Sequence, residues 1–264
     1  MKKDGHPSRR KRITKVRGFD RYLSSLLEVV KKDLLPWIAR ERKPLSDALA
    51  NHIFDLPGPT VVGGNFSGRQ IHHSKIFKEF EEVSQSFDRL NDIEFYVGRF
   101  PFQNTTISRE RYLQFHVESY LHEVYVLEQR LLRYLKVVER QFRNDSRLSE
   151  IRARCEILRE VVRRALTNPV KLRGVHVHEE RFSDKGLSRL RTIALLSDNG
   201  DDSLAPTMKS LYQWEHQKIK KHWKETIAAN NVSTRDMLDT YFDELFKIVF
   251  AKSGRMQYPS RLIS

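Results

Sequence analysis

The sequence is short of cysteine, of turn-forming residues and of long apolar segments. Cys155 is the only cysteine in 264 residues, which excludes an intrachain disulfide and a cysteine-based zinc site. Nine prolines and eleven glycines are few for this length, so long helices are favoured over a many-turned β architecture. No apolar run approaches the ~20 residues that cross a bilayer, and no secretory signal follows the basic N-terminus. We therefore expect a soluble cytoplasmic protein without a membrane partner, in which Cys155 is a buried thiol.

Positive charge is abundant and clustered. Lysine and arginine total 48 against 34 acids, a formal net charge of +14, which favours polyanionic partners such as RNA or another nucleic acid. Residues 1–17 hold eight basic side chains and one acid, and we expect them to form a flexible basic arm. Such an arm can neutralise phosphates without sequence preference or simply keep the protein soluble. Its expected nucleic-acid contacts are Arg9, Arg10, Lys11 and Arg12.

Apolar residues recur at helical spacing along most of residues 18–264. Helices are predicted over residues 19–35, through the seventies and eighties, and from about 108 to 143. The last of these carries two apolar series that repeat every seven residues: Leu113, Tyr120, Leu127 and Tyr134, and Val117, Val124, Leu131 and Val138. The pattern predicts an all-α, mainly single-domain protein, a bundle of long antiparallel helices with additional N- and C-terminal helices.

A second long helix is predicted directly after Asn144-Asp145. Its apolar positions are Leu148, Ile151, Cys155, Leu158, Val162 and Ala165. The short connection favours antiparallel packing on the preceding helix. The outer face is rich in arginine, and Arg152, Arg159 and Arg163 are candidates for nucleic-acid contact. The alternative is a solvated face on which neighbouring glutamates balance part of the charge.

The C-terminal third is predicted to hold three further helices. A Ser183-Asp184 cap begins a helix with Leu187, Leu190, Ala194 and Leu195 on its apolar face. Another runs from about Met208 to Ala228, and a last one begins at a Ser233-x-x-Asp236 cap. His72-His73, at the start of the helix through the seventies, are expected to be exposed.

The densest group of catalytically useful side chains is Lys171–Arg181. It follows Asn168-Pro169, which we expect to end the preceding helix, and Gly174 disfavours an unbroken helix here. In a loop that enters a helix, Arg173 and His178 can face one phosphate. A histidine near neutral pKa can take the proton of a ribose 2′-hydroxyl, while an arginine holds the phosphate oxygens.

The neighbours of this pair suggest supporting roles and one competing chemistry. His176 is a candidate second proton-transfer group. Glu179 or Glu118 can orient the imidazole of His178, and His116 is a candidate neighbour of the same site. Cleavage of RNA by attack of the 2′-hydroxyl on the phosphate requires no metal and no cofactor. The alternatives are a His176-x-His178 metal site with a glutamate as third ligand, and a charged helix-entry loop whose histidines satisfy backbone groups.

The segment Arg173-Gly-Val-His-Val-His178, after two long antiparallel helices, resembles the signature of the HEPN superfamily, an arginine followed after four to six residues by a histidine. Phe115-His-Val-Glu118-Ser-Tyr is similar to a segment of some bacterial members. The similarity covers at most residues 105–200. It implies a helical, metal-independent endoribonuclease or an inactive RNA-binding relative. It also implies a homodimer with a shared cleft, and a toxin–antitoxin or antiviral role with a protein antitoxin or partner subunit. It carries over to Arg173 and His178 only.

Overall fold

The computed structural model describes residues 17–33, 67–99, 107–178, 184–199 and 205–262. The described residues form an all-α protein, as the periodicity predicts, and hold no strand apart from the isolated bridge between Phe250 and Met256. None of their helices is long and apolar enough to cross a membrane. The helices are α1 (Gly18–Asp33), α3 (Gly68–Val97), α4 (Arg109–Gln141), α5 (Leu148–His178), α6 (Lys185–Asn199) and α7 (Ala205–Val249).

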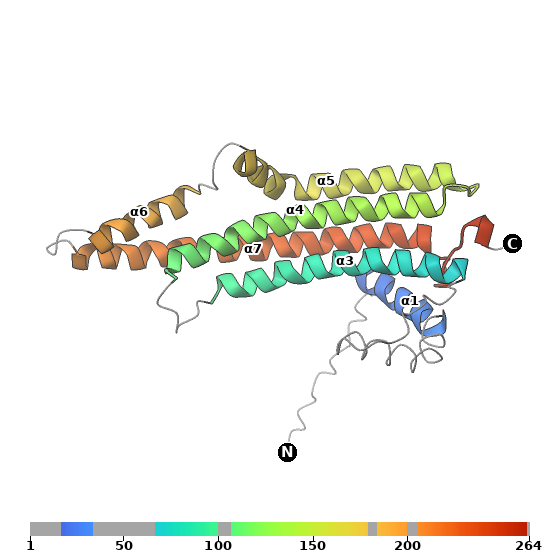
Figure 1. Cartoon of the computed structure of the whole chain (residues 1–264), viewed down its shortest axis with the longest axis horizontal. Coiled ribbons are helices and arrows are strands. Elements are labelled where there is room, and N and C mark those ends of the chain that lie inside the picture. Colours follow the sequence, from blue (N-terminus) through green and yellow to red (C-terminus); the bar gives the residue numbers. More distant parts are fainter. Residues whose placement is uncertain (1–16, 34–66, 100–106, 179–183, 200–204, 263–264) are drawn as a thin grey trace, which may run out of the picture.

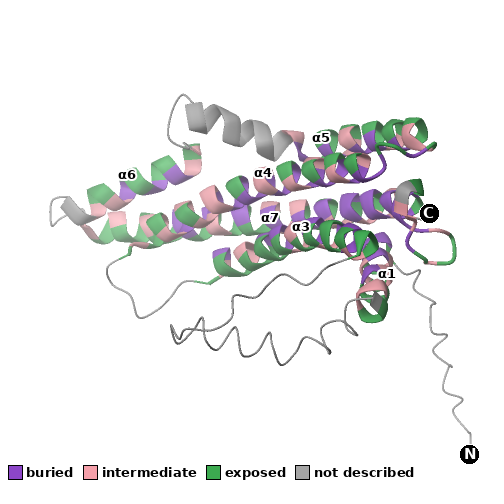
Figure 2. Ribbon diagram, turned by 45° about the vertical axis from the view of Figure 1, so that its right-hand side comes forward, coloured by how far each residue is buried: buried purple, intermediate pink, exposed green. Residues whose placement is uncertain are grey.

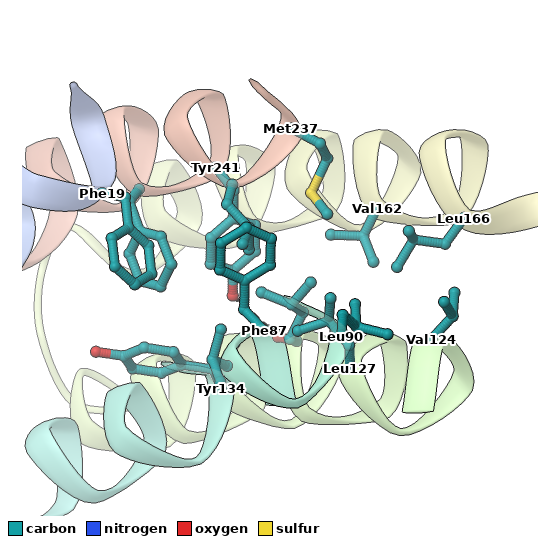
Figure 3. Close-up of a cluster of buried hydrophobic side chains, with 14 of the residues drawn as sticks. Phe19, Phe87, Leu90, Val124, Leu127, Tyr134, Val162, Leu166, Met237 and Tyr241 are labelled. Carbon is teal, nitrogen blue, oxygen red and sulfur yellow. Dashed lines mark hydrogen bonds between the residues drawn. The ribbon is translucent and has the colours of Figure 1, made fainter. Parts of the chain in front are cut away.

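Four long helices, α3, α4, α5 and α7, lie nearly parallel to one another and form the bundle (Figure 1). α4 packs between α3 and α5, α7 contacts all three, and α1 packs on α7 and α3 near one end. Both seven-residue series of α4 are buried along their whole length, which confirms the predicted seam. Figure 2 shows buried residues on the inner faces of these helices and exposed residues outside. The core therefore runs along the bundle (Figure 3).

An aromatic cluster joins four helices at one end of this core. The ring of Phe242 in α7 lies 5.2 Å from that of Phe19, 4.9 Å from that of Tyr22 and 5.3 Å from that of Phe80. Tyr22 and Tyr134 share a hydrogen bond of 2.7 Å between their hydroxyl groups. Because both hydroxyls are fully buried, this bond satisfies groups that would otherwise destabilise the core.

The C-terminal region differs from the prediction, because α7 is a single helix of 45 residues. The predicted gap after Ala228 and the Ser233 cap are therefore wrong. Asn231, in the middle of the supposed gap, is buried and binds both neighbouring helices. Its amide nitrogen donates to the backbone oxygen of Leu90 and to the carboxylate of Glu94, and its oxygen accepts from Tyr120. These tertiary hydrogen bonds offset the weak helix propensity of asparagine.

Other expected exposures also change once the helices pack. His72 and His73 are each about 1% exposed, so their predicted exposure is wrong; they contact Gln141 and Tyr258, respectively. Conversely, Leu195 is exposed on α6. Tyr258 of the C-terminal tail packs on both imidazoles, with its ring centroid 5.8 Å from that of His72 and 5.3 Å from that of His73. Cys155 is fully buried, as predicted, and burial raises the pKa of its thiol to about 12.

Asp145 links the turn between α4 and α5 to the C-terminal tail. Its buried carboxylate accepts hydrogen bonds from the backbone and guanidinium of Arg147, at 3.0 and 2.9 Å, and from the backbone and hydroxyl of Ser260, both at 3.2 Å. These donors, led by the Arg147 side chain, hold the pKa of Asp145 well below its usual range. The charged form of the carboxylate is therefore the one that stabilises the fold.

Replacement of Asp145 by asparagine is expected to destabilise the protein by about 1–3 kcal/mol at pH 7. Because the folded-state pKa is depressed, this stabilisation is present above the ordinary aspartate pKa near 4 and is lost as the pH falls below it. Urea unfolding at pH 7, 5 and 3 should show the two proteins converging in acid. The exposed Asp236→Asn is the control, and an Asp145→Asn deficit that stays constant over this range would contradict the prediction.

Candidate active site

The backbone of α5 stays helical from Leu148 to His178. It passes through Asn168-Pro169 and Gly174, so the predicted helix break before Lys171 is wrong. A proline inside a helix removes one hydrogen bond and bends the axis, but it does not have to end the helix. Figure 1 shows the last turns of α5 turned away from the axis of the preceding ones. The candidate residues thus lie at the end of a long helix.

Arg173, His176 and His178 lie within the last two turns of α5. Their side chains, and all of Glu179, lie outside the described residues. Five residues of regular helix correspond to about 500° of rotation, so positions 173 and 178 are about 140° apart around the helix axis. On a continuous helix, the two positions of one chain do not share a face.

The neighbouring helix α4 carries His116 and Glu118. An ion pair of 2.6 Å between Arg159 and Glu139 sets the antiparallel register of the two helices. After Pro169 the last turns of α5 turn away from the axis of the earlier ones (Figure 1), so this register does not extend to positions 173–178.

His116 is half-buried between two aromatic side chains. Its ring stacks on Tyr96 at 5.5 Å between centroids and meets the edge of Tyr112 at 4.4 Å. Burial lowers the pKa of His116 below its usual value, so the imidazole is neutral at pH 7. A neutral imidazole in this position can accept a proton or a hydrogen bond.

His116 and Glu118 both line a groove of about 560 Å³ between α3 and α4. Phe115 projects from its rim with 63% of its surface exposed, and the Glu118 carboxylate accepts a hydrogen bond of 2.8 Å from Gln114. Sequence reasoning missed the other polar groups of this groove, namely Arg89, Asp92, Ser119, His122 and Glu123. The four-residue spacing of Glu118 and His122 on a helix was a signal that they share a face.

The arginine face of α5 is partly neutralised. Arg159 is bound by Glu139 and by Glu156, and only 16% of its side chain is exposed. Arg159 links α4 to α5 through these ion pairs, so its guanidinium is poorly placed to bind a phosphate. Arg152 and Arg163 are exposed, and their contact with nucleic acid stays a prediction. The basic residues Arg9, Arg10, Lys11 and Arg12 lie outside the described part of the chain.

Within the described residues, no group of three or more histidine, cysteine or acidic side chains is arranged to hold a metal ion. The side chains of His176 and His178, proposed as the alternative metal site, lie outside the described residues. Comparison of the chain with protein-family models, with curated proteins and with solved structures found no match. The assignment of a function therefore depends on the residues of this chain alone.

Proposed function

We propose that the protein is a metal-independent endoribonuclease that acts in the cytoplasm through Arg173 and His178. The observation that supports the proposal is the position of this pair in the last turns of α5, on the helix that packs against α4. The net charge of +14 supports a polyanionic substrate. The resemblance to the HEPN signature is limited to the same two residues.

The proposed reaction is an internal transesterification of RNA. His178 removes the proton of a ribose 2′-hydroxyl, and the 2′-oxygen attacks the adjacent phosphorus atom. The bond from phosphorus to the 5′-oxygen breaks, which leaves a 2′,3′-cyclic phosphate and a 5′-hydroxyl protonated by His176 or by water. Arg173 stabilises the negative charge that builds on the phosphate oxygens. Glu118 or Glu179 orients the imidazole of His178.

Helix geometry favours a site shared by two subunits. The positions of Arg173 and His178 are about 140° apart around one helix axis, which is too far for both to face the same phosphate from a regular helix. In a homodimer with twofold symmetry, each residue of one chain can meet the other residue of its partner. We therefore propose that Arg173 of one copy and His178 of the second copy complete each site.

Cleavage of a labelled single-stranded RNA in excess EDTA tests the activity. The wild-type protein is expected to cleave it, and His178→Ala is expected to leave it intact. The matched control is His222→Ala, which removes an exposed histidine of α7 and should cleave like wild type. Equal loss of RNA with wild type and His178→Ala would contradict the proposal, and cleavage abolished by EDTA would favour the metal alternative.

A second candidate function is RNA binding without cleavage. It is favoured by the exposure of Arg152 and Arg163 on α5 and by the lysines of α7, which need no catalytic pair. It predicts strongly salt-dependent binding that survives His178→Ala and weakens when residues 1–17 are deleted. Intact RNA in the cleavage assay, together with tight binding, would select this function.

A further inference from the structure

The first half of α7, residues 205–228, is flanked by α6 and begins beyond the ends of α3 and α4 (Figure 1). Its inner face is held by specific contacts. Glu215 pairs with Arg189 of α6 at 2.7 Å, and Tyr212 donates a hydrogen bond of 2.6 Å to Glu110 of α4. Ile219, Trp223 and Ile227 are buried on the same side. The opposite face of this segment therefore points to solvent on a rigid support.

The segment that carries this outer face is rich in lysine. Residues 205–228 hold five lysines against two glutamates, and one of those glutamates, Glu215, is buried against α6. Within the described residues, no acid lies at ion-pair distance from Lys218, Lys220 or Lys224, and Lys221 reaches Glu225 only at 4.0 Å. Lys218 and Lys221 share this face with Glu225, whereas Lys209, Lys220 and Lys224 lie about 80–140° from Trp214 around the helix axis. The two lysines of the face can attract phosphates.

Trp214 lies about one helical turn before Lys218 on this face, with 59% of its surface exposed. The ammonium group of Lys218 lies 5.0 Å from the centre of its ring. Residues 214, 218 and 221 follow one another at helical spacing, so they form a single stripe along α7. A large aromatic ring exposed among lysines is the combination that single-stranded nucleic acids use, because bases stack on the ring while cations hold the phosphates.

We propose that the stripe Trp214–Lys218–Lys221 binds single-stranded RNA, with one base stacked on Trp214 and the backbone phosphates held by the two lysines. The inference rests on the proposed RNA substrate, and it adds a binding site that is separate from the end of α5. Duplex RNA is disfavoured, since its paired bases offer no free face to an aromatic ring. An anionic membrane is also disfavoured, because a membrane-surface helix needs a broad apolar face. Among residues 205–228, Leu211 is the one other large apolar side chain that is exposed, and α6 adds Leu195 and Leu196, which do not make a broad apolar face.

Binding of a fluorescent oligouridine 12-mer to the full chain, followed by fluorescence polarisation, tests the site. All proteins carry His178→Ala, so that cleavage does not interfere. Trp214→Ala is expected to weaken binding by roughly 5- to 150-fold, whereas Trp214→Phe should retain most of the affinity. Val232→Ala removes an apolar side chain that is similarly exposed (64%) on the same helix, and it should bind like the parent. Lys218→Gln with Lys221→Gln should reduce the salt dependence of binding, by about 0.7 in slope for each lysine.

Three outcomes would overturn the site. If Trp214→Ala is folded by circular dichroism and binds the RNA within twofold of the parent's affinity, base stacking on Trp214 is excluded. Equal affinity for a duplex of the same length would exclude a preference for single strands. Binding to phosphatidylserine vesicles that depends on Trp214 and exceeds RNA binding would assign the face to a membrane. Loss of cleavage in His178→Ala with intact binding separates this site from the proposed catalytic pair.

Discussion

Chains carrying Arg173→Ala, refolded together with chains carrying His178→Ala, are expected to recover RNA cleavage that neither variant shows alone. Loss of a general base typically lowers a rate by about 10²–10⁴-fold, so each variant by itself should be nearly inactive. In a symmetric mixed dimer, one of the two shared sites keeps both wild-type residues. Random mixing at equal amounts should therefore restore on the order of a quarter of wild-type activity. The rate of cleavage of a labelled RNA in EDTA provides the measurement.

The matched control mixes wild-type chains with the double variant Arg173→Ala/His178→Ala. A mixed dimer of this kind has no complete shared site, so activity should fall to about half of that of the wild-type chains alone. A site within one chain predicts no loss in this control and no recovery in the first mixture. That pair of results would show that the end of α5 departs from a regular helix and that each chain acts by itself.

Replacement of Phe242 by alanine is expected to lower the free energy of unfolding by about 3–5 kcal/mol. The side chain is fully buried and its ring contacts those of Phe19, Tyr22 and Phe80 from α1 and α3. The cavity left by its removal would lie where four helices meet, so the surrounding helices cannot collapse on it without losing other contacts. Urea unfolding followed by circular dichroism at 222 nm measures the change.

Phe115→Ala is the matched control, because it makes the same chemical change on an exposed residue. It should alter the unfolding free energy by no more than about 0.5 kcal/mol. Phe242→Leu, which retains most of the apolar volume, should cost less than the alanine variant. A loss below about 1.5 kcal/mol for Phe242→Ala would show that the aromatic cluster is not a critical part of the core.

The long apolar series were read correctly from the sequence because burial and spacing coincide there. Each seventh residue of α4 faces the same side of the helix, and that side is covered by α3, α5 and α7. The Asp184 cap of α6 could be predicted for a similar reason. The carboxylate of Asp184 accepts a hydrogen bond of 2.9 Å from the backbone of Leu187, which lies within one turn. Both are local patterns that do not depend on distant residues.

The errors arose where a local signal was overridden by contacts with other helices. The asparagines after Ala228 favour a helix end, but Asn231 is held inside α7 by Leu90, Glu94 and Tyr120. The exposure of Leu195 was likewise missed, because a helix only 15 residues long can turn its apolar side in more than one direction. The helical spacing of Trp214, Lys218 and Lys221 also did not reveal that this side of α7 is uncovered, because the packing of α4 and α6 on α7 decides which of its sides stays open.

At the candidate active site, the sequence alone determines which side chains are present, Arg173 and His178, and how many residues separate them. The sequence does not determine the backbone conformation of this segment, because proline and glycine permit either a break or a bend in a helix. In the packed bundle the helix continues as far as His178. That outcome separates the two positions around one axis, and it is the reason why we propose the shared cleft of a homodimer instead of a pair within one chain. Local periodicity thus determined which helices exist, while packing among them decided how far each helix runs and which of its faces remains open.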